Sequence, residues 1–123
     1  MKKRILIFDD DHDTLTVLKD SLTIAGFEVL DIYHSDNLYR LIEEFKPDIL
    51  LLDYILFGEN GGEICYGIKH NPITKNLPIV LMSGYPRLSE TMGNYGCDAM
   101  IAKPFDLGEL IKVLNDVLVN VMI

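Results

Sequence analysis

Short runs of aliphatic residues alternate along the chain with segments whose apolar residues recur every three or four positions. The runs are too short for helices, which favours buried strands. Because they lack the alternation of polar and apolar residues that marks a half-exposed sheet, we expect parallel strands covered on both faces. The predicted strands are 4–8, 29–33, 49–52, 79–82 and 99–102.

The segments between the strands carry helix signals. The first helix is expected to begin at the candidate N-cap Asp13 and to end at Gly26. The second is expected to be capped by Ser35 or Asp36 and stopped by Pro47. Alternating strands and helices indicate an α/β fold with one open, doubly wound sheet.

The later helices differ in the strength of their patterns. A glycine-rich loop, 58–62, leads into a third helix that carries Ile64 and Ile68, whereas residues 87–95, where a fourth helix belongs, are weakly patterned. The last helix opens with Asp106 and Glu109 as a capping pair. The apolar tail 117–123 is either the last turn of this helix, packed on the sheet, or a contact with a second copy of the chain or with a linker.

A polar residue follows four of the five aliphatic runs. Asp9 and Asp10 follow the first, Asp53 the third, Ser83 the fourth and Lys103 the fifth. The carboxyl ends of parallel strands meet at one edge of a sheet, where ligands of such folds bind. Each residue alone has a simpler explanation as a helix cap, turn former or solvated charge. Together they predict a site.

The predicted site has the chemistry of phosphoryl transfer. Three close carboxylates repel one another and need a cation, and oxygen ligands favour Mg²⁺. Lys103 and Ser83 could hold the remaining phosphate oxygens. Asp53 ends the most hydrophobic run and is the best candidate for a covalent acceptor. His12 is expected to face solvent.

Four segments together resemble the receiver domain of two-component response regulators. They are Ile-Leu-Ile-Phe-Asp9-Asp10, Ile-Leu-Leu-Leu-Asp53, Ile-Val-Leu-Met-Ser83-Gly84 and Lys103-Pro104-Phe105. The resemblance covers the whole chain and implies a single receiver domain, 1–123. It also implies a flavodoxin-like, five-stranded (βα)5 sheet with strand order 2-1-3-4-5.

The resemblance also implies roles for individual residues. Asp53 would be the phosphoacceptor. Mg²⁺ would be held by Asp9, Asp10, Asp53 and the backbone carbonyl of Ile55. The phosphoryl group would be bound by Ser83, Gly84 and Lys103, and the Lys103-Pro104 peptide would be cis.

Other positions concern switching and lifetime. Met100 stands where the family has an aromatic switch residue, and Phe57 and Asn60 replace a proline and an acid of the loop after the phosphoacceptor. Ile55 and Tyr85, each two residues beyond a strand-end polar group, are expected to tune dephosphorylation by limiting access of water.

Composition narrows the class of protein. A formal net charge of −8 over 123 residues argues against direct nucleic-acid binding, and the apolar runs are too short to span a membrane. Cys65 and Cys97 lack metal-ligand spacing and are expected to be reduced packing residues. We expect a cytoplasmic protein that is not an enzyme beyond its own phosphorylation and dephosphorylation. Its expected partners are a sensor histidine kinase or phosphotransfer protein and an unidentified effector, with a second copy of the chain as a further candidate.

Three other functions would each require residues that differ from those of this chain. A phosphohydrolase of the haloacid-dehalogenase type would need Thr or Val at the position of Asp13 and a late acidic pair after Lys103. A flavodoxin-type FMN binder would not place three acids in its phosphate loop. A degenerate receiver would lack a key residue, and none is missing. Whether the chain stands alone or comes from a larger regulator or hybrid kinase stays open.

Overall fold

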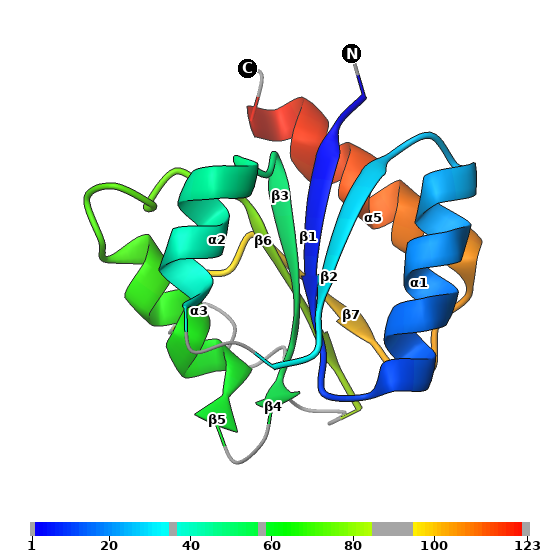
Figure 1. Ribbon diagram of the computed structural model, residues 1–123, viewed down its shortest axis with the longest axis horizontal. Coiled ribbons are helices and arrows are strands. Elements are labelled where there is room, and N and C mark those ends of the chain that lie inside the picture. Colours follow the sequence, from blue (N-terminus) through cyan, green and yellow to red (C-terminus); the bar gives the residue numbers. More distant parts are fainter. Residues whose placement is uncertain (1, 35–36, 57–58, 85–94, 122–123) are drawn as a thin grey trace.

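The computed structural model describes residues 2–34, 37–56, 59–84 and 95–121. Five parallel strands form one sheet in the order β2-β1-β3-β6-β7 (Figure 1). They are β1 (Arg4–Phe8), β2 (Glu28–Ile32), β3 (Ile49–Asp53), β6 (Ile79–Ser83) and β7 (Ala99–Ala102). Since β6 and β7 are the fourth and fifth strands of this sheet, the predicted order 2-1-3-4-5 is confirmed.

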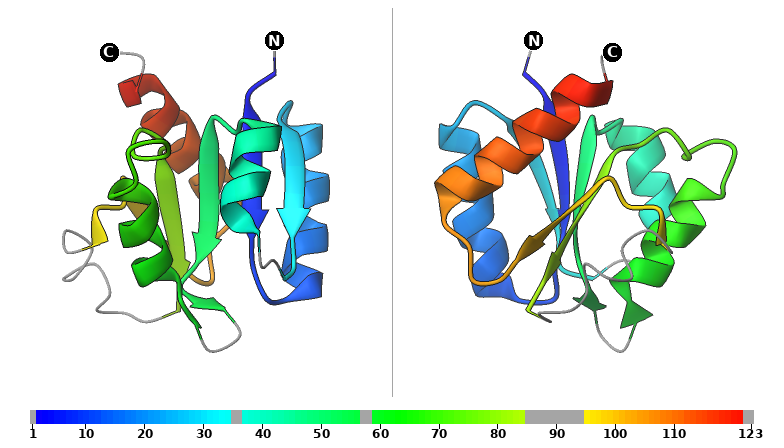
Figure 2. Two further views of the ribbon diagram at one scale, coloured as in Figure 1. Left: turned by 60° about the vertical axis from the view of Figure 1, so that its left-hand side comes forward. Right: turned by 180° about the vertical axis from the view of Figure 1, so that it is seen from behind.

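Helices cover both faces of the sheet. The described helices are α1 (His12–Ile24), α2 (Leu38–Phe45), α3 (Gly61–Lys69) and α5 (Leu107–Val121). In Figures 1 and 2, α1 and α5 pack on one face, and α2 and α3 on the other. The expected fourth helix falls largely in residues 85–94, which lie outside the described residues. No helix of the described segments is long and apolar enough to cross a membrane.

The central strands are apolar on both sides because they separate two cores. Ile5 and Ile7 of β1 pack with α1 and α5, whereas Leu6 and Phe8 pack with α2 and α3. Strand β3 alternates in the same way, and all five of its residues are buried. This arrangement explains why the sequence shows continuous aliphatic runs.

Two aspartates join the amino ends of neighbouring strands by hydrogen bonds. Asp48 precedes β3, and its Oδ2 accepts from the backbone N of Arg4 at 2.8 Å while its own N donates to the Arg4 carbonyl at 2.8 Å. Asp98 precedes β7 and makes the same pair of bonds with Ile79, at 2.7 and 2.8 Å. Each aspartate therefore sets the register of one strand against its neighbour.

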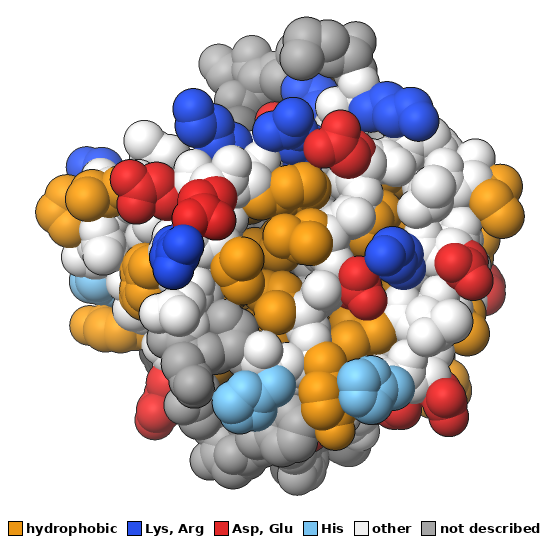
Figure 3. All heavy atoms as spheres, in the orientation of Figure 1, with side chains coloured by type: hydrophobic (Ala, Val, Ile, Leu, Met, Phe, Trp, Pro, Cys, Tyr) orange, Lys and Arg blue, Asp and Glu red, His pale blue; other side chains and the backbone are white. Residues whose placement is uncertain are grey.

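Strand β2 forms one edge of the sheet. Between α1 and α2, hydrophobic side chains are visible on this side of the molecule (Figure 3). Asp31 of β2 forms a 3.3 Å ion pair with Lys19 of α1. A charged pair on an edge strand discourages pairing with further strands.

Several predicted boundaries were wrong by a few residues. The N-cap of α1 is Asp11, whose extended backbone lets its side chain accept from the N of Asp13, so Asp13 lies in the first turn. Strand β2 begins one residue earlier than predicted because Glu28 pairs with Arg4, and Tyr33 instead stacks on the exposed His12 ring at 3.5 Å. The second helix has Asn37 as its N-cap residue, whereas Ser35 and Asp36 lie outside the described residues.

The loop after β3 also differs from the prediction. It contains a short antiparallel hairpin of β4 (Ile55–Leu56) and β5 (Glu59–Asn60), and Gly61 and Gly62 already belong to α3. At the start of α5 the prediction is confirmed, because Asp106 Oδ1 accepts from the backbone N of Glu109 at 2.7 Å. Gly26 ends α1 with a φ of +105°, which favours glycine.

Candidate functional site

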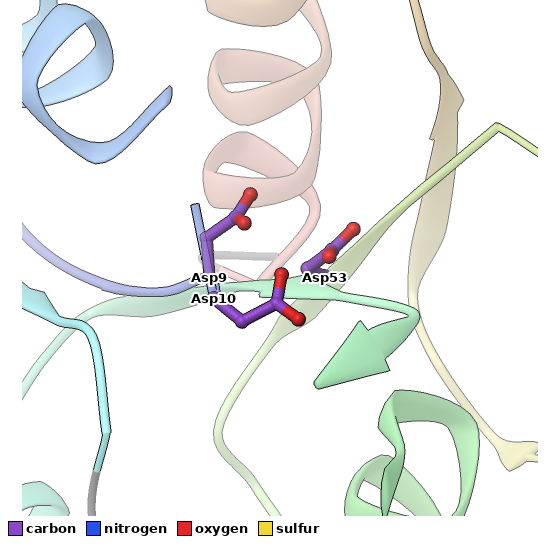
Figure 4. Close-up of side chains that lie close together, drawn as sticks. All are labelled: Asp9, Asp10 and Asp53. Carbon is purple, nitrogen blue, oxygen red and sulfur yellow. The ribbon is translucent and has the colours of Figure 1, made fainter. Parts of the chain in front are cut away.

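The carboxyl ends of β1 and β3 bring three carboxyl groups together. Asp9 and Asp10 follow β1, Asp53 is the last residue of β3, and oxygens of the three lie within 4.8 Å of one another (Figure 4). Asp9 is 0% and Asp53 8% exposed, while Asp10 is half-buried. The structure thus joins the acids that the sequence places at this edge.

Lys103 supplies a positive charge to the same cluster. Its Nζ lies 3.1 Å from Asp9 Oδ2 and 3.1 Å from Asp53 Oδ1. The backbone of Lys103 donates to the Ser83 carbonyl at 2.7 Å, which ties the end of β7 to the end of β6. The Lys103-Pro104 peptide is cis, as the resemblance implied.

The electrostatics of the cluster are set by burial and by like charges. Burial raises the pKa of Asp53 to about 6, and the neighbouring Asp9 charge adds to this effect while Lys103 opposes it. Burial alone would lower the pKa of Lys103, but the attraction of Asp53 and Asp9 outweighs it and leaves that pKa raised. One ammonium therefore compensates three carboxyl groups incompletely.

The backbone around Asp53 is held at several points. Asp53 lies opposite Met82 in the sheet, and the next residue, Tyr54, donates its backbone N to the Met82 carbonyl at 2.9 Å. The N of Gly61 donates to the Tyr54 carbonyl at 2.6 Å. A Cβ on Gly61 would collide with the backbone carbonyl of Asp53, so this close approach requires glycine.

Asp11 is engaged in capping α1. Its carboxylate accepts from the backbone N of Asp13 and from the hydroxyl of Thr14, both at 3.0 Å. The bond from Thr14 is the main reason why the pKa of Asp11 is lowered. The backbone N of Asp11 donates to Asp9 Oδ1 at 3.0 Å, which orients the Asp9 carboxylate. Of the three consecutive acids, Asp9 and Asp10 therefore contribute to the cluster and Asp11 supports it.

The donor set fits a hard divalent cation. All three side chains offer carboxylate oxygens, and the described part of the cluster contains no histidine or cysteine ligand. Such a set suits Mg²⁺ better than Zn²⁺. The cation would also relieve the excess negative charge between Asp9 and Asp53.

The remaining predicted residues of the described segments lie on β4, on β7, and at or after the end of β6. Ser83 is the last residue of β6 and is 2% exposed, and Gly84 follows it at the surface. Ile55 begins β4, where its backbone pairs with Asn60. Met100 of β7 lies opposite Leu81 of β6 and packs against the core beneath α2 and α3. Tyr85 and Phe57 lie outside the described residues.

The sequence did not predict a polar cluster next to Asp53. The Tyr54 hydroxyl accepts from Asn60 Nδ2 at 3.0 Å and lies 3.5 Å from the Tyr95 hydroxyl. Asn60 Oδ1 also caps α3 by accepting from the backbone N of Gly62 at 2.7 Å. Asn before a helix is an ordinary N-cap signal that could have revealed this role. The Tyr54 and Tyr95 contact joins distant parts of the chain and leaves no local signal.

Comparison with known proteins identifies the family. The model of the response regulator receiver domain matches residues 5–115. The chain belongs to the response regulator receiver domain family. Receiver domains are part of two-component signalling, and they bind Mg²⁺ through an acidic pocket of the kind that Asp9, Asp10 and Asp53 form here.

Individual relatives place this receiver domain among response regulators. It is 31% identical over 118 residues to the phosphate regulon transcriptional regulatory protein PhoB of Pseudomonas aeruginosa, a match covering 94% of this chain and 52% of PhoB. The chain thus spans about half the length of the curated relatives it matches.

Solved structures agree with this assignment. A two-component response regulator from Clostridium difficile superposes with a TM-score of 0.83 at 27% identity, covering 95% of this chain and 96% of that one. The chemotaxis response regulator CheY4 of Vibrio cholerae superposes with a TM-score of 0.85 at 19% identity, covering 95% and 99%. At that identity CheY4 supports the fold alone.

Proposed function

We propose that residues 1–123 act as a receiver domain in which Asp53 accepts a phosphoryl group in a Mg²⁺-dependent reaction. The observation that carries this proposal is the single ammonium of Lys103 placed 3.1 Å from both Asp9 and Asp53 beside Asp10. This arrangement combines a buried acceptor carboxylate, a metal-binding acidic pair and a fixed cation for phosphoryl oxygens.

The proposed donor is a phosphohistidine of a sensor histidine kinase or phosphotransfer protein. An oxygen of the Asp53 carboxylate forms a bond to phosphorus while the phosphorus–nitrogen bond breaks. The imidazole leaves with the electron pair and takes up a proton. The chain would thus catalyse only its own phosphorylation and the later hydrolysis of the aspartyl phosphate.

Mg²⁺ would be held by the carboxylates of Asp9, Asp10 and Asp53 and by the backbone carbonyl of Ile55. When bound, it neutralises charge that develops on the transferring phosphoryl oxygens. Burial of Asp53 at the end of a rigid strand orients the acceptor oxygen. The bond from the Asp11 backbone to Asp9 holds the metal-binding pair in place before the reaction.

The new phosphoryl group would be bound by Lys103, Ser83 and Gly84. Lys103 can turn from Asp9 toward the phosphoryl oxygens because its ammonium already lies between the two carboxylates. Ser83 stands on β6, next to β3, and its backbone carbonyl already accepts from Lys103. These contacts support a switch that starts at β6 and β7.

The roles of Met100, Ile55 and Tyr85 are part of the same proposal. Met100 packs against the core and its side chain is unbranched and flexible, so we propose a switch that does not rely on a swinging ring at this position. Ile55 and Tyr85 would limit access of water to the aspartyl phosphate and so prolong its life.

A groove on the side of the sheet that α1 and α5 cover suits the proposed protein donor. It measures about 340 Å³ and lies between α1 and the start of α5. Val17 and Leu107, which line it, are 63% and 40% exposed. An apolar surface of this kind would let a partner dock while its histidine approaches Asp53. The downstream partner stays unidentified, and a homodimer through the tail is one alternative.

Intact mass spectrometry with acetyl phosphate as donor tests the assignment of Asp53. We expect the parent to gain one phosphoryl group with Mg²⁺ and none with EDTA. Asp53→Asn should gain none, and Asp10→Asn should gain it more slowly. Asp116→Asn, which removes an exposed carboxylate of α5, should react like the parent.

Two outcomes would contradict the proposal. Equal phosphorylation of Asp53→Asn would show that another group is the acceptor. Release of inorganic phosphate over many turnovers from small phosphomonoesters would favour the phosphohydrolase alternative.

A further inference from the structure

The two cysteines of the chain meet on the face of the sheet that α2 and α3 cover. Cys65 lies in α3 with 0% exposure, and Cys97 is half-buried just before β7. Both are reduced, belong to the same apolar cluster, and are joined by a hydrogen bond between their sulfur atoms. Their separation in sequence gave no sign of this contact.

The residues on both sides of Cys97 make contacts with α3 or with the sheet. Lys69, one helical turn after Cys65, forms a 2.7 Å ion pair with Asp98 and donates to the Leu77 carbonyl at 2.7 Å. The Lys69 side chain also lies against Gly96, whose φ is +82°. In both views of Figure 2 the yellow segment before β7 runs beside α3. The two thiols are therefore held together by contacts other than their own.

We propose that Cys65 and Cys97 form a redox-active dithiol, which a peroxide converts into an intramolecular disulfide. The sulfur of Cys97, the more exposed of the two, attacks one peroxide oxygen, the oxygen–oxygen bond breaks, and water leaves after taking up a proton. Cys97 is then a sulfenic acid. The Cys65 sulfur attacks the Cys97 sulfur, the sulfur–oxygen bond breaks, and a second water leaves with the Cys65 proton. The two thiols lose two electrons, which reduce one peroxide to two waters.

The two sulfur atoms have different surroundings. These favour the order in which Cys97 reacts with the peroxide first and Cys65 attacks second. The hydrogen bond from Cys65 lowers the pKa of Cys97, and it outweighs burial and the charge of Asp98, which act in the opposite direction. The charge of Lys69 makes a smaller contribution that also lowers this pKa. The hydrogen bond to Cys97 and burial raise the pKa of Cys65, so the buried thiol keeps its proton until the second step. A more acidic, more exposed cysteine beside a second thiol is the usual arrangement of redox-sensing pairs.

The test uses the folded full chain and hydrogen peroxide, without phosphodonor or Mg²⁺. After oxidation, unfolding and alkylation, the parent should take up no alkylating group and should have lost two hydrogens, and treatment with a reductant should restore two alkylatable thiols. Peptide mapping should show Cys65 linked to Cys97. Cys65→Ser should stop at a sulfenic acid on Cys97 that dimedone traps, and Cys97→Ser should react at least tenfold more slowly.

Three results would overturn the proposal: full alkylation of both thiols after oxidation of the folded parent, disulfides only between two chains, or equal peroxide reactivity of the two serine variants. Lys112→Ala, which changes an exposed lysine remote from the thiols, is the control for a general effect of charge and should oxidise like the parent. Because no phosphorylation is measured, failure of this proposal leaves the assignment of Asp53 untouched.

Discussion

Asp53 is buried beside another negative charge, so its ionised form destabilises the folded chain. The size of this destabilisation therefore depends on pH. Its folded pKa of about 6 lies above the ordinary value of 3.8, so the folded chain binds the proton more tightly than the unfolded chain. The free energy of unfolding should fall as pH rises from about 4 to about 6 in the absence of metal. The full effect corresponds to about 3 kcal/mol.

Asp53→Asn should remove this destabilisation, because asparagine carries no charge. With EDTA present, we expect the variant to be more stable than the parent by about 1 to 3 kcal/mol at pH 7, and nearly equal to it at pH 4, where Asp53 is protonated. Urea unfolding at the two pH values measures the difference. An equal gain at both pH values would show that ionisation of Asp53 is not the cause.

Helix α3 starts so close to Asp53 that its first residue has no room for a side chain. Gly61→Ala places a methyl group against the Asp53 carbonyl, and both contacting groups are backbone. We expect a loss of about 2 kcal/mol or more in stability and slower phosphorylation, because Asp53 must shift. Thermal unfolding and the intact-mass assay measure the two effects.

Gly67→Ala is the matched control in the same helix. Its methyl group would approach only the Tyr39 hydroxyl, at 3.2 Å, and that side chain is 44% exposed and can move. Alanine favours the helix by about 1 kcal/mol over glycine. The variant should be as stable as the parent or slightly more stable, with unchanged phosphorylation. Equal losses of stability in both variants would show that the Gly61 substitution acts through α3 itself and not through crowding of Asp53.

Elements could be predicted from the sequence where one local signal dominates. Strands 4–8 and 99–102 have the predicted bounds because apolar runs end sharply there. The N-cap of α1 was wrong because Asp11 and Asp13 offer the same side chain, and only backbone geometry distinguishes them. The β4–β5 hairpin was missed because two-residue strands have no period to detect.

The candidate site was predictable for a different reason. Parallel strands deliver their carboxyl ends to one edge, so topology alone brings Asp9, Asp53 and Lys103 together. The contact between Cys65 and Cys97 depends on how α3 packs beside β7, and residue spacing does not encode this packing.

For the whole molecule, the excess negative charge at the site predicts that stability depends on Mg²⁺. Binding to the folded chain alone raises stability with cation concentration, by about 2.7 kcal/mol at one hundred times the dissociation constant. We expect the melting temperature of the parent to rise with Mg²⁺ and that of Asp10→Asn to rise much less. Differential scanning calorimetry with Mg²⁺, and with Na⁺ at matched ionic strength, measures this.

A general salt effect is the competing explanation. Asp31→Asn serves as the control, because it removes an acid of the edge strand that pairs with Lys19 away from the cluster. Its response to Mg²⁺ should equal that of the parent. An equal response of Asp10→Asn would contradict the proposed metal site.

Because of the aspartates before β3 and β7, the two ends of the sheet differ in the interactions that hold the strands together. At the amino ends, Asp48 and Asp98 each add a side-chain bond to a backbone bond. At the other ends of β1 and β3, about 16 Å away along a five-residue strand, the groups that meet are three carboxylates that repel one another and that Lys103 balances only in part. Local opening of the sheet should therefore start at the site and fade toward the amino ends. Strands β1, β3, β6 and β7 are held at their amino ends by these aspartates. Chemistry at Asp53 should therefore rearrange the opposite end of the sheet without unfolding the domain.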